Sequence, residues 1–441
     1  MPVLAWLLNS IYVALLLVYV PFRWVVRRKG IAGWKQKFLG QVPLRSGARP
    51  CLWLHAVSVG EVVQLQSILR DLSSRHPELE VVISTTTPTG YDVARQRYAQ
   101  HSVFYFPFDF SWAVNAALSR INPTAIALVE LELWPNFVLA AAKREIPLAL
   151  INGRITERSF RGYSRIRPLM RTLLRKLSVV AVQSELYATR LINLGADPAQ
   201  MHITGSIKFD GVETQRSHPR TAALREYFGL RDDEVVFIAG STQDPEERYA
   251  LESYQTLRAR DPRLRLILVP RHKERFDEVA RLVTGEFRLP LVRRSGQAGA
   301  DTTRSTPPDT PPVLLLDTLG ELSYCWGLAD IAFVGGSLTQ RGGQNMIEPA
   351  GFGAAVLFGP NTWNFKDVVE LLLTHDAARV VHSGAELTFR LAELLADADG
   401  ARQLGHRARD LVTAQAGATG RTVELLAGLL PEPPRWQNHA A

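Results

Sequence analysis

Short apolar runs alternate with stretches of helical periodicity along most of the chain. The first half contains six such runs, at residues 51–57, 79–85, 102–108, 124–132, 147–153 and 178–184. The second half contains six more, at residues 235–241, 264–270, 312–318, 331–337, 354–360 and 378–383. Continuous apolar runs of this length between helices indicate parallel strands that are buried on both faces. The two series predict an α/β protein with two Rossmann-like, doubly wound domains that face a cleft.

The alternation pauses at residues 202–230, which contain few long apolar runs. We therefore expect an N-terminal domain at residues 31–215, a C-terminal domain at 216–425 and a tail at 426–441. Ligands of such domains bind beyond the carboxyl ends of the strands, so polar motifs directly after strands are the candidates for a site. The polar, proline-rich stretch 295–312 is expected to be a surface loop.

An uncharged apolar segment of 18 residues runs from Val3 to Val20, ahead of the first strand. A cluster of positive charge follows it: Arg23, Arg27, Arg28 and Lys29. The segment is at the short end of the roughly 17–25 residues that span a bilayer as a helix. A cleaved signal peptide would carry positive charge before the apolar run rather than after it. We expect residues 1–30 to anchor the protein in a membrane, with the domains on the cytoplasmic side. The alternative is an interfacial or buried amphipathic helix.

The 441 residues include 51 Lys+Arg and 43 Asp+Glu, which gives a formal net charge of +8. This surplus indicates an acidic partner, such as a nucleic acid, a membrane surface or an anionic substrate. The two cysteines, Cys51 and Cys325, are far apart and lie in apolar runs. They exclude a disulfide framework and a cysteine-ligated zinc site, and we expect both to be buried.

The first predicted strand leads into Ser58, Gly60 and Glu61, where a helix begins. Small residues at this turn let a ligand approach the backbone, and the helix N-terminus offers free N–H groups to an anion. Glu61 lies in the first helical turn, where the helix dipole stabilises its charged form. The alternative is a capping box, in which Ser58 and Glu61 exchange hydrogen bonds with the backbone.

The fourth predicted strand ends in Glu130 and Glu132, which its alternation would place on one face. A carboxylate at the end of an apolar strand is costly unless it is paired or faces a site, so at least one of them is expected to have a function. An ion pair with a neighbouring arginine is the alternative. Lys208, just before the domain boundary, would hold a carboxylate or a phosphate as a point charge, or be a solvated lysine.

Polar turns follow four predicted strands of the second half. They are Gly240-Ser241-Thr242, Pro270-Arg271, Leu319-Gly320-Glu321, and Ser337, which leads into Asn345-Met346-Ile347-Glu348. Glycine-rich turns beside a helix start suit a phosphate, and a glutamate one turn later can accept both hydroxyls of a ribose. There is no GxGxxG motif, Walker P-loop or HExxH motif, so neither NAD, ATP nor a metal is indicated. We expect no cofactor.

Taken in order, these segments resemble the 3-deoxy-D-manno-octulosonic acid (Kdo) transferases of lipopolysaccharide synthesis. The matching motifs are HAVSVGE (55–61), STTTPTG (84–90), YFPFD (105–109), ELELWPN (130–136), INGRI (151–155), TGSIKFD (204–210), VPRH (269–272), DTLGEL (317–322), FVGGSL (333–338) and GGQNMIEPA (342–350). The resemblance covers nearly the whole chain. It implies a two-domain B-type (GT-B) glycosyltransferase that moves Kdo from CMP-Kdo to the lipid A precursor, lipid IVA.

By this resemblance Glu61 is the catalytic base, while Glu132 or its neighbour Glu130, together with Lys208, stabilises the transition state. CMP would be held by Pro270, Arg271, Leu319, Gly320, Glu321 and the segment from Asn345 to Glu348. Two positions depart from the family pattern. Gln243 and Gln344 each stand where a histidine is usual, and glutamine can donate a hydrogen bond but cannot become cationic.

The segment from Arg154 to Lys176 contains eight basic residues and one acid, with Phe160 and Tyr163 among them. A phosphorylated glycolipid at a bilayer surface suits such a patch, so Arg154, Arg161 and Arg165 are candidates for substrate binding. The alternatives are a solvated helix face and nucleic-acid binding, but no nucleic-acid motif accompanies the charge.

Two other functions compete with the Kdo transferase interpretation. One is another GT-B nucleotide-sugar enzyme, such as an epimerase, because this fold supports several chemistries. The other is a membrane-tethered binding protein without catalytic activity, which the presence of Glu61, Glu132 and Lys208 disfavours.

Overall fold

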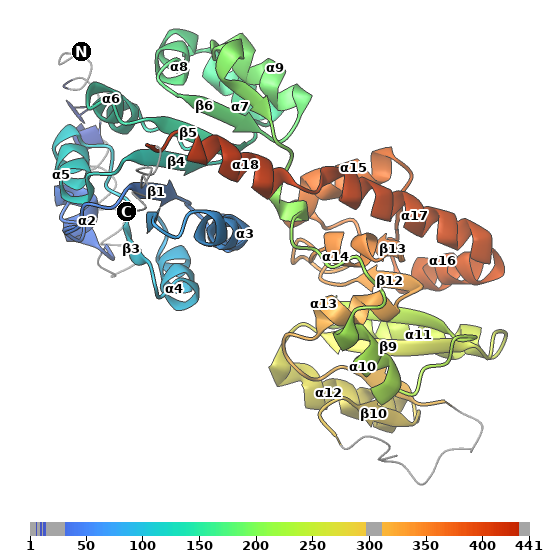
Figure 1. Cartoon of the computed structure of the whole chain (residues 1–441). Coiled ribbons are helices and arrows are strands. Elements are labelled where there is room, and N and C mark those ends of the chain that lie inside the picture. Colours follow the sequence, from blue (N-terminus) through green and yellow to red (C-terminus); the bar gives the residue numbers. More distant parts are fainter. Residues whose placement is uncertain (1–5, 7–8, 11, 15–30, 297–310, 432–441) are drawn as a thin grey trace, which may run out of the picture. The chain divides into compact units, whose positions relative to one another are not determined.

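The computed structural model describes residues 6, 9–10, 12–14, 31–296 and 311–431. The chain divides into two compact units. The first consists of residues up to Asp210 together with those from Gln415 onward, and the second of Gly211–Ala414. Each unit is built around one sheet with helices on both faces (Figure 1). The two-unit α/β organisation predicted from the apolar runs is confirmed.

The first unit contains a parallel sheet of seven strands in the order β3-β2-β1-β4-β5-β6-β7. The strands are β1 (Cys51–His55), β2 (Glu80–Thr85), β3 (Ser102–Tyr105), β4 (Ala125–Val129), β5 (Leu148–Gly153), β6 (Val179–Val182) and β7 (Met201–Ile203). In the register, Leu52 of β1 pairs with Val81 on one side and with Ala125 on the other. The chain changes direction across the sheet between β1 and β4, which is where ligands of doubly wound sheets bind.

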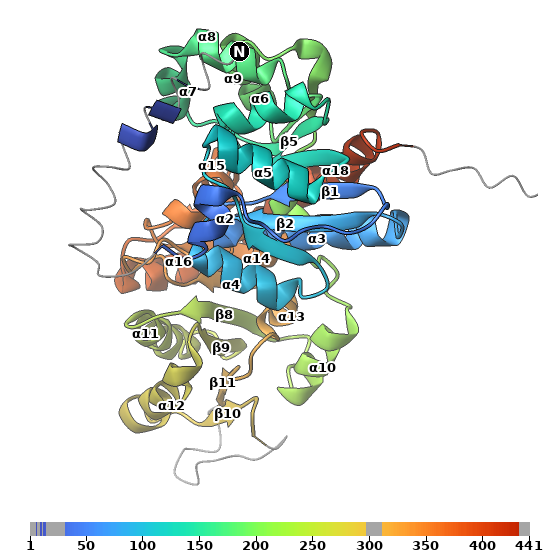
Figure 2. The same cartoon turned by 90° about the vertical axis from the view of Figure 1, so that its left-hand side faces the viewer.

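The side chains of β1 alternate between two apolar cores, one on each face of this sheet. Cys51 and Trp53 pack into the core under α5, α6, α8 and α9, whereas Leu52 and Leu54 pack under α3, α4 and α18. The helices are α2 (Trp34–Leu39), α3 (Val59–Arg75), α4 (Pro88–Arg97), α5 (Ser111–Ile121), α6 (Pro135–Lys143), α7 (Glu157–Ser164), α8 (Arg167–Leu174), α9 (Glu185–Leu194) and α18 (Ala418–Ala427). Helix α2 lies beside α5 (Figure 2). Cys51 and Cys325 are both buried, as predicted.

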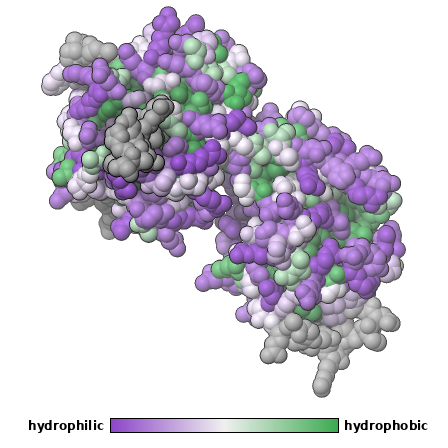
Figure 3. All heavy atoms as spheres, viewed as in Figure 1, coloured by the Kyte–Doolittle hydropathy of each residue, from purple (hydrophilic) through white to green (hydrophobic). Residues whose placement is uncertain are grey.

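The second unit also contains a parallel sheet of seven strands, in the order β10-β11-β9-β8-β12-β13-β14. These are β8 (Val235–Thr242), β9 (Leu264–Pro270), β10 (Leu291–Arg293), β11 (Val313–Leu315), β12 (Ile331–Val334), β13 (Ala355–Phe358) and β14 (Ala378–Val380). The helices are α10 (Pro219–Tyr227), α11 (Glu246–Arg258), α12 (Phe276–Arg281), α13 (Leu322–Cys325), α14 (Ile347–Gly351), α15 (Lys366–Thr374), α16 (Gly384–Ala396) and α17 (Ala398–Gln415). On the face shown in Figure 3 hydrophilic residues predominate, so the long apolar runs are largely inside.

The end of the chain departs from the predicted domain limits. The prediction assigned residues up to 425 to the second domain, but α18 packs against α3 of the first unit. The Asp210 carboxylate accepts hydrogen bonds from the backbone N–H groups of Gly417, at 2.7 Å, and Thr419, at the start of α18. The polypeptide therefore leaves the first unit after Asp210 and returns to it at Gln415 (Figure 1). The sequence did not show that α18 belongs to the first unit, because its helical periodicity is ordinary and it follows the helices of the second unit along the chain.

The predicted anchor, residues 1–30, lies largely outside the described residues. No helix in the described part of the chain is long and apolar enough to cross a membrane. Of the described residues in this segment, Asn9 is buried and donates a hydrogen bond to Ser111 Oγ at 2.7 Å. The Tyr12 hydroxyl donates to Asp109 at 3.0 Å. Two polar groups of the apolar run thus have partners in the first unit. Of the predicted loop 295–312, residues 297–310 also lie outside the description.

Candidate active site

The Glu61 carboxylate is folded back over the N-terminus of α3. Its Oε1 accepts hydrogen bonds from Ser58 N–H at 3.2 Å and from Ser58 Oγ at 2.7 Å, and its Oε2 accepts one from Val57 N–H at 2.8 Å. Ser58 Oγ in turn accepts the backbone N–H of Glu61. This is the capping box that the sequence left open as the alternative. Glu61 is only 9% exposed, whereas Gly60 beside it is exposed.

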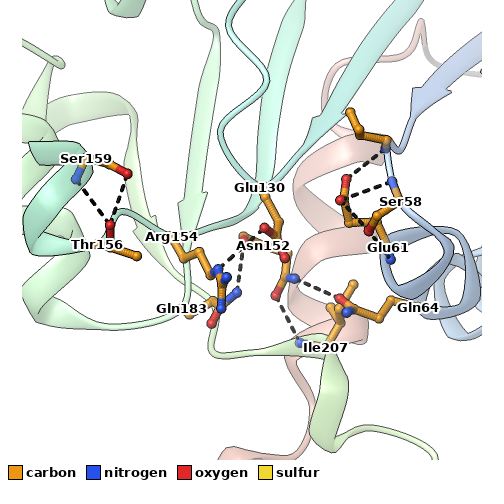
Figure 4. A network of polar contacts seen from close by, with 11 residues as sticks. Ser58, Glu61, Gln64, Glu130, Asn152, Arg154, Thr156, Ser159, Gln183 and Ile207 are labelled. Carbon is orange, nitrogen blue, oxygen red and sulfur yellow. Dashed lines mark hydrogen bonds and ion pairs between the residues drawn. The ribbon is translucent and has the colours of Figure 1, made fainter. Parts of the chain in front are cut away.

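Glu130 is not part of β4, which ends at Val129. Its backbone has a φ of +61°, a left-handed conformation that takes the chain out of the strand. The expectation that Glu130 and Glu132 share a strand face is therefore wrong, because strand alternation does not extend past Val129. Glu130 Oε2 lies 3.4 Å from Arg154 Nε, beyond the end of β5 (Figure 4). The ion pair proposed as the alternative for one of these acids is thus present at Glu130.

Glu132 lies close enough to Glu61 to be affected by its charge. Burial raises the pKa of Glu132 to about 7, and the negative charge of Glu61 adds to this effect. A hydrogen bond from Trp134 Nε1, at 3.1 Å, acts in the opposite direction. Glu132 also interacts with Glu130, and it contributes to the raised pKa of Tyr163, whose main cause is burial. Glu61, Glu130 and Glu132 thus lie together beyond the ends of β1 and β4. Tyr163 of helix α7 lies close enough to Glu132 to be affected by its charge.

Lys208 lies in a short 3₁₀ helix, Ile207–Phe209, after β7. It is partly buried, and Ser206 Oγ accepts its backbone N–H at 3.5 Å. Within the described residues, no hydrogen bond or ion pair engages its ammonium group. Lys208 is therefore available to an anionic ligand.

Asn152, which the sequence did not single out, links these parts of the site (Figure 4). Its side-chain amide donates to Gln64 Oε1 of α3 at 3.0 Å and accepts from Ile207 N–H at 3.3 Å. Gln183 Nε2 donates to its backbone carbonyl at 3.0 Å. A signal was present in the sequence, because Asn152 follows the apolar part of a predicted strand and belongs to the INGRI motif.

The basic segment forms helices α7 and α8. Helix α7 buries none of its residues, so its arginines lie at the surface. Arg161 Nε contacts Glu157 at 3.0 Å, and Arg190 of α9 contacts the other oxygen of Glu157 at 2.7 Å. Arg161 is exposed, as is Arg165 at the end of α7. The geometry agrees equally with acceptor binding and with a solvated helix face.

The glycine turn after β12 does not offer its N–H groups to a ligand. The buried Glu246 carboxylate accepts hydrogen bonds from Gly336 N–H at 2.7 Å, Ser337 N–H at 3.0 Å and Leu338 N–H at 2.9 Å. The Ser337 hydroxyl donates to Val334 O and accepts from Gly359 N–H, and Ser337 is fully buried. Ser337 is therefore not available as the predicted ligand-binding residue. Its groups hold the turn together.

The two departures from the family pattern lie together against this turn. A β-carbon at Gly336 would lie 3.3 Å from Gln344 Nε2 and 3.5 Å from Gln243 Nε2. Gln344 and Gln243 are thus neighbours, although a hundred residues separate them in the chain. A neutral pair avoids the mutual repulsion that two protonated histidines would have at this position.

The remaining predicted nucleotide-binding residues fall into accessible and buried groups. Arg271 and Leu319 are exposed, whereas the side chains of Met346 and Ile347 are buried, which leaves only their backbones for a ligand. Glu348 accepts a hydrogen bond from Asn345 Nδ2 at 3.0 Å, and burial raises its pKa while Arg271 opposes the rise. Pro270 ends β9, and Gly320, with a φ of +84°, lies in the turn after β11.

Glu321 is held by protein groups of the same unit. Its carboxylate accepts hydrogen bonds from Arg294, with Nη2 to Oε1 at 3.0 Å, and from the Thr318 hydroxyl. These contacts hold the pKa of Glu321 below its usual value despite burial. Among the described residues, no group of three or more His, Cys, Asp or Glu side chains is arranged to hold a metal ion.

Comparison with known proteins decides the family. Residues 32–211 match the family model described as 3-Deoxy-D-manno-octulosonic-acid transferase (kdotransferase). The 3-deoxy-D-manno-octulosonic acid transferase of Haemophilus influenzae is 33% identical over 378 residues, which are 85% of this chain and 86% of that protein. The chain belongs to the Kdo transferase family. The Bordetella pertussis member is also 33% identical, over 420 residues that cover 91% of this chain and 94% of that protein.

The fold of this Kdo transferase family member is shared with solved structures of low sequence identity. The UDP-GlcNAc 2-epimerase from Neisseria meningitidis, solved with UDP-GlcNAc bound, has a TM-score of 0.55. Its sequence identity is 12%, and the likeness covers 86% of this chain and all of the epimerase chain. At this identity the likeness shows the fold alone. The family assignment, made from the sequence relatives, identifies the protein as a glycosyltransferase.

Proposed function

We propose that this enzyme is an inverting GT-B glycosyltransferase that moves Kdo from CMP-Kdo to the lipid A precursor, lipid IVA. The names of the relatives identify the sugar. The observation that carries the proposal is the coupling of Glu61 and Glu132 at the carboxyl ends of β1 and β4, where doubly wound sheets bind their ligands. A carboxylate with a raised pKa beside a second carboxylate, as Glu132 is beside Glu61, is typical of sites that transfer protons.

In the proposed reaction an acceptor hydroxyl attacks the anomeric carbon of Kdo while its proton passes to Glu61. Oε2 is the atom that takes the proton, because it accepts one hydrogen bond where Oε1 accepts two. A new bond forms between the acceptor oxygen and the anomeric carbon, and the bond from that carbon to the phosphate oxygen breaks. CMP leaves with the bonding electrons. A single displacement of this kind inverts the anomeric carbon.

Glu132 and Lys208 would stabilise the transition state in different ways. At a pKa of about 7, roughly half of Glu132 is protonated at neutral pH, and its O–H can donate a hydrogen bond to developing negative charge. The Lys208 ammonium would oppose charge on the Kdo carboxylate or on the phosphate. The exposed backbone at Gly60 would let the donor approach the start of α3.

The CMP moiety would contact the second unit through Arg271, the turn at Leu319 and Gly320, and the segment around Asn345. The Asn345 amide already contacts Glu348, so a ribose would bind to a carboxylate whose position is set. This reaction needs no cofactor from the protein, since the leaving group is already activated.

We further propose that the enzyme works at the cytoplasmic face of the inner membrane. Two features of the first unit support this: exposed Trp34 of α2 and Trp112 of α5, and the surface arginines of α7. Helices α2, α5, α6, α8 and α7 contact one another in succession, so these features lie along one series of helices. Tryptophan and basic side chains are those that bind a phospholipid surface.

The deciding experiment is a product assay on the purified full-length protein with CMP-Kdo and lipid IVA, read by mass spectrometry. Addition of Kdo, with release of CMP, is the expected result, and the mass gives the number of Kdo residues added. UDP-GlcNAc serves as the competing donor. Turnover of UDP-GlcNAc without turnover of CMP-Kdo would replace the proposal with an epimerase or another GT-B activity.

A further inference from the structure

Asn152 occupies a position that its own chemistry explains only in part. It is fully buried near the end of β5, and its backbone has a φ of +51°. Asparagine tolerates this left-handed conformation better than most residues, but glycine adopts it at no steric cost. The backbone alone would therefore favour glycine. The side chain must contribute something that glycine lacks.

That contribution is two hydrogen bonds to different elements of the first unit (Figure 4). One reaches Gln64 on α3, a single helical turn after Glu61. The other receives the backbone N–H of Ile207, the residue directly before Lys208. The two groups proposed as the base and as the charge stabiliser are thus connected through one buried amide.

We propose that Asn152 is a positioning residue, which sets the N-terminal turn of α3 and the turn that carries Lys208 in the arrangement that glycosyl transfer requires. This inference rests on the proposed function, because it concerns how that site is held. Asn152 contacts neither substrate nor the reacting atoms in this scheme. It acts through Gln64 and Ile207. A small displacement of the start of α3 or of the turn at Ile207 is enough to misplace a reacting group.

The first test replaces Asn152 without straining the backbone. Asn152→Gly keeps the left-handed conformation accessible and removes both side-chain hydrogen bonds, so we expect kcat for Kdo transfer to fall about 10–100-fold. Leu148→Ala is the matched control, because it destabilises the buried core of the same strand and leaves the network intact. Assays are run well below the melting temperature of both variants. If the two variants lose kcat alike, or Asn152→Gly keeps it within twofold, the inference fails.

The second test removes the hydrogen bond to Gln64 alone, and then restores a hydrogen-bonding side chain at position 152. Gln64→Ala removes only the hydrogen bond to α3 and should lower kcat with little change in the KM for CMP-Kdo. The control is Gln66→Ala, two residues along the same helix, whose side chain contacts Arg97 instead. Asn152→Asp keeps an acceptor for Ile207 N–H, and Gln64 can turn its amide to donate to it, so part of kcat should return. No recovery over Asn152→Gly would contradict a role through these bonds.

A third measurement does not depend on activity. Hydrogen exchange in Asn152→Gly should accelerate at residues 58–64 and at 206–209, and remain unchanged at α4 on the same face of the sheet. Unchanged exchange at both segments would overturn the inference even if the wild-type enzyme transfers Kdo. Conversely, faster exchange together with an inactive wild type would count against the proposed function and not against the positioning role.

Discussion

The carboxylate of Glu246 accepts the backbone N–H of Gly336 at 2.7 Å, although the two residues are 90 positions apart. Glu246 also binds the N–H groups of Ser337, Leu338 and Gln243, so one buried acid satisfies four backbone donors. The neighbouring Gly335 has no room for a side chain, since a β-carbon would lie 2.5 Å from Thr242 Cα. The N–H groups of the glycine turn after β12, which the sequence suggested as a phosphate-binding turn, are thus bonded to the Glu246 carboxylate.

Glu246→Gln should destabilise the second unit by about 2–4 kcal/mol. The amide replaces an acceptor oxygen by an N–H₂ group that faces backbone donors, and the charge that strengthens these bonds is lost. Urea unfolding of the full-length protein measures the change. Glu252→Gln, an exposed change on the same helix α11, is the control and should stay within about 0.5 kcal/mol of the wild type.

Stability should depend on pH through Glu132. Its pKa rises from an ordinary value of 4.5 to about 7 in the folded protein, which therefore binds the proton more tightly than the unfolded chain does. The stabilisation from this proton is complete below pH 4.5 and is lost as pH rises toward 7. Glu132→Gln should therefore stabilise the protein by about 1–2 kcal/mol at pH 8, after allowance for partial exposure, and by less at pH 5.

Melting curves of the wild type and of Glu132→Gln at pH 5 and pH 8 measure this effect. An equal difference at both values of pH would show that Glu132 does not titrate in this range. The Kdo transfer rate of the same variant should lose any dependence on an ionisation near pH 7, because the amide donates a hydrogen bond at every pH, whereas the carboxyl group donates one only while it is protonated.

Twelve strands of the two sheets could be predicted because central parallel strands are buried on both faces and read as unbroken apolar runs. β7 and β10 were missed because each has three residues at a sheet edge and is not extended by an apolar run, whereas β14, also a three-residue edge strand, continues into buried Val381. The extent of β4 was overestimated because the apolar pattern continues through Leu131 and Leu133 after the backbone has left the sheet at Glu130.

Contacts in the candidate site could be predicted where the partners are close in the sequence, and were missed where the partners are far apart in the sequence. The capping box of Ser58 and Glu61 involves a spacing of three residues, so the sequence could name it. The contact of Asn152 with Gln64 spans 88 positions, and no local pattern shows it. Ser337 was misassigned for the same reason, since its partners belong to other elements, such as Gly359 after β13.

Glu61→Ala should abolish Kdo transfer while CMP binding persists, because the base is lost and the second unit is unchanged. Loss of the capping box should cost about 1 kcal/mol of stability. Glu61→Gln is the companion variant, since it retains most of the cap but cannot accept a proton. Turnover and CMP binding by calorimetry are the measurements. Near-normal turnover of either variant would remove Glu61 from the mechanism.

Charge reversal at Arg161 and Arg165 should raise the KM for lipid IVA by about tenfold or more and leave CMP binding unchanged. The physical reason is the loss of two positive charges from a surface that would face a phosphorylated acceptor. Arg260→Glu and Arg281→Glu, both exposed changes on the second unit, carry the same alteration in net charge. If the two double variants behave alike, the basic surface of α7 does not bind the acceptor.

Trp34→Glu with Trp112→Glu should weaken binding of the full-length protein to vesicles of phosphatidylethanolamine and phosphatidylglycerol by about tenfold. Both indoles are about half exposed, at 53% and 47%. Trp363→Glu changes a tryptophan of similar exposure, 55%, in the second unit and should have no effect. Co-flotation without detergent measures the binding. Undiminished flotation of the double variant would assign membrane contact to residues 1–30 alone.

The return of α18 to the first unit sets an order on how the protein can be made. The apolar side of α3 is completed by Val423 and Leu426, which leave the ribosome only after the whole second unit has been synthesised. The amino-terminal half therefore stays open along one face for most of translation, and truncation at the boundary near residue 210 would leave it so permanently. What looks in the sequence like two domains in series is, in its connectivity, one domain inserted into another.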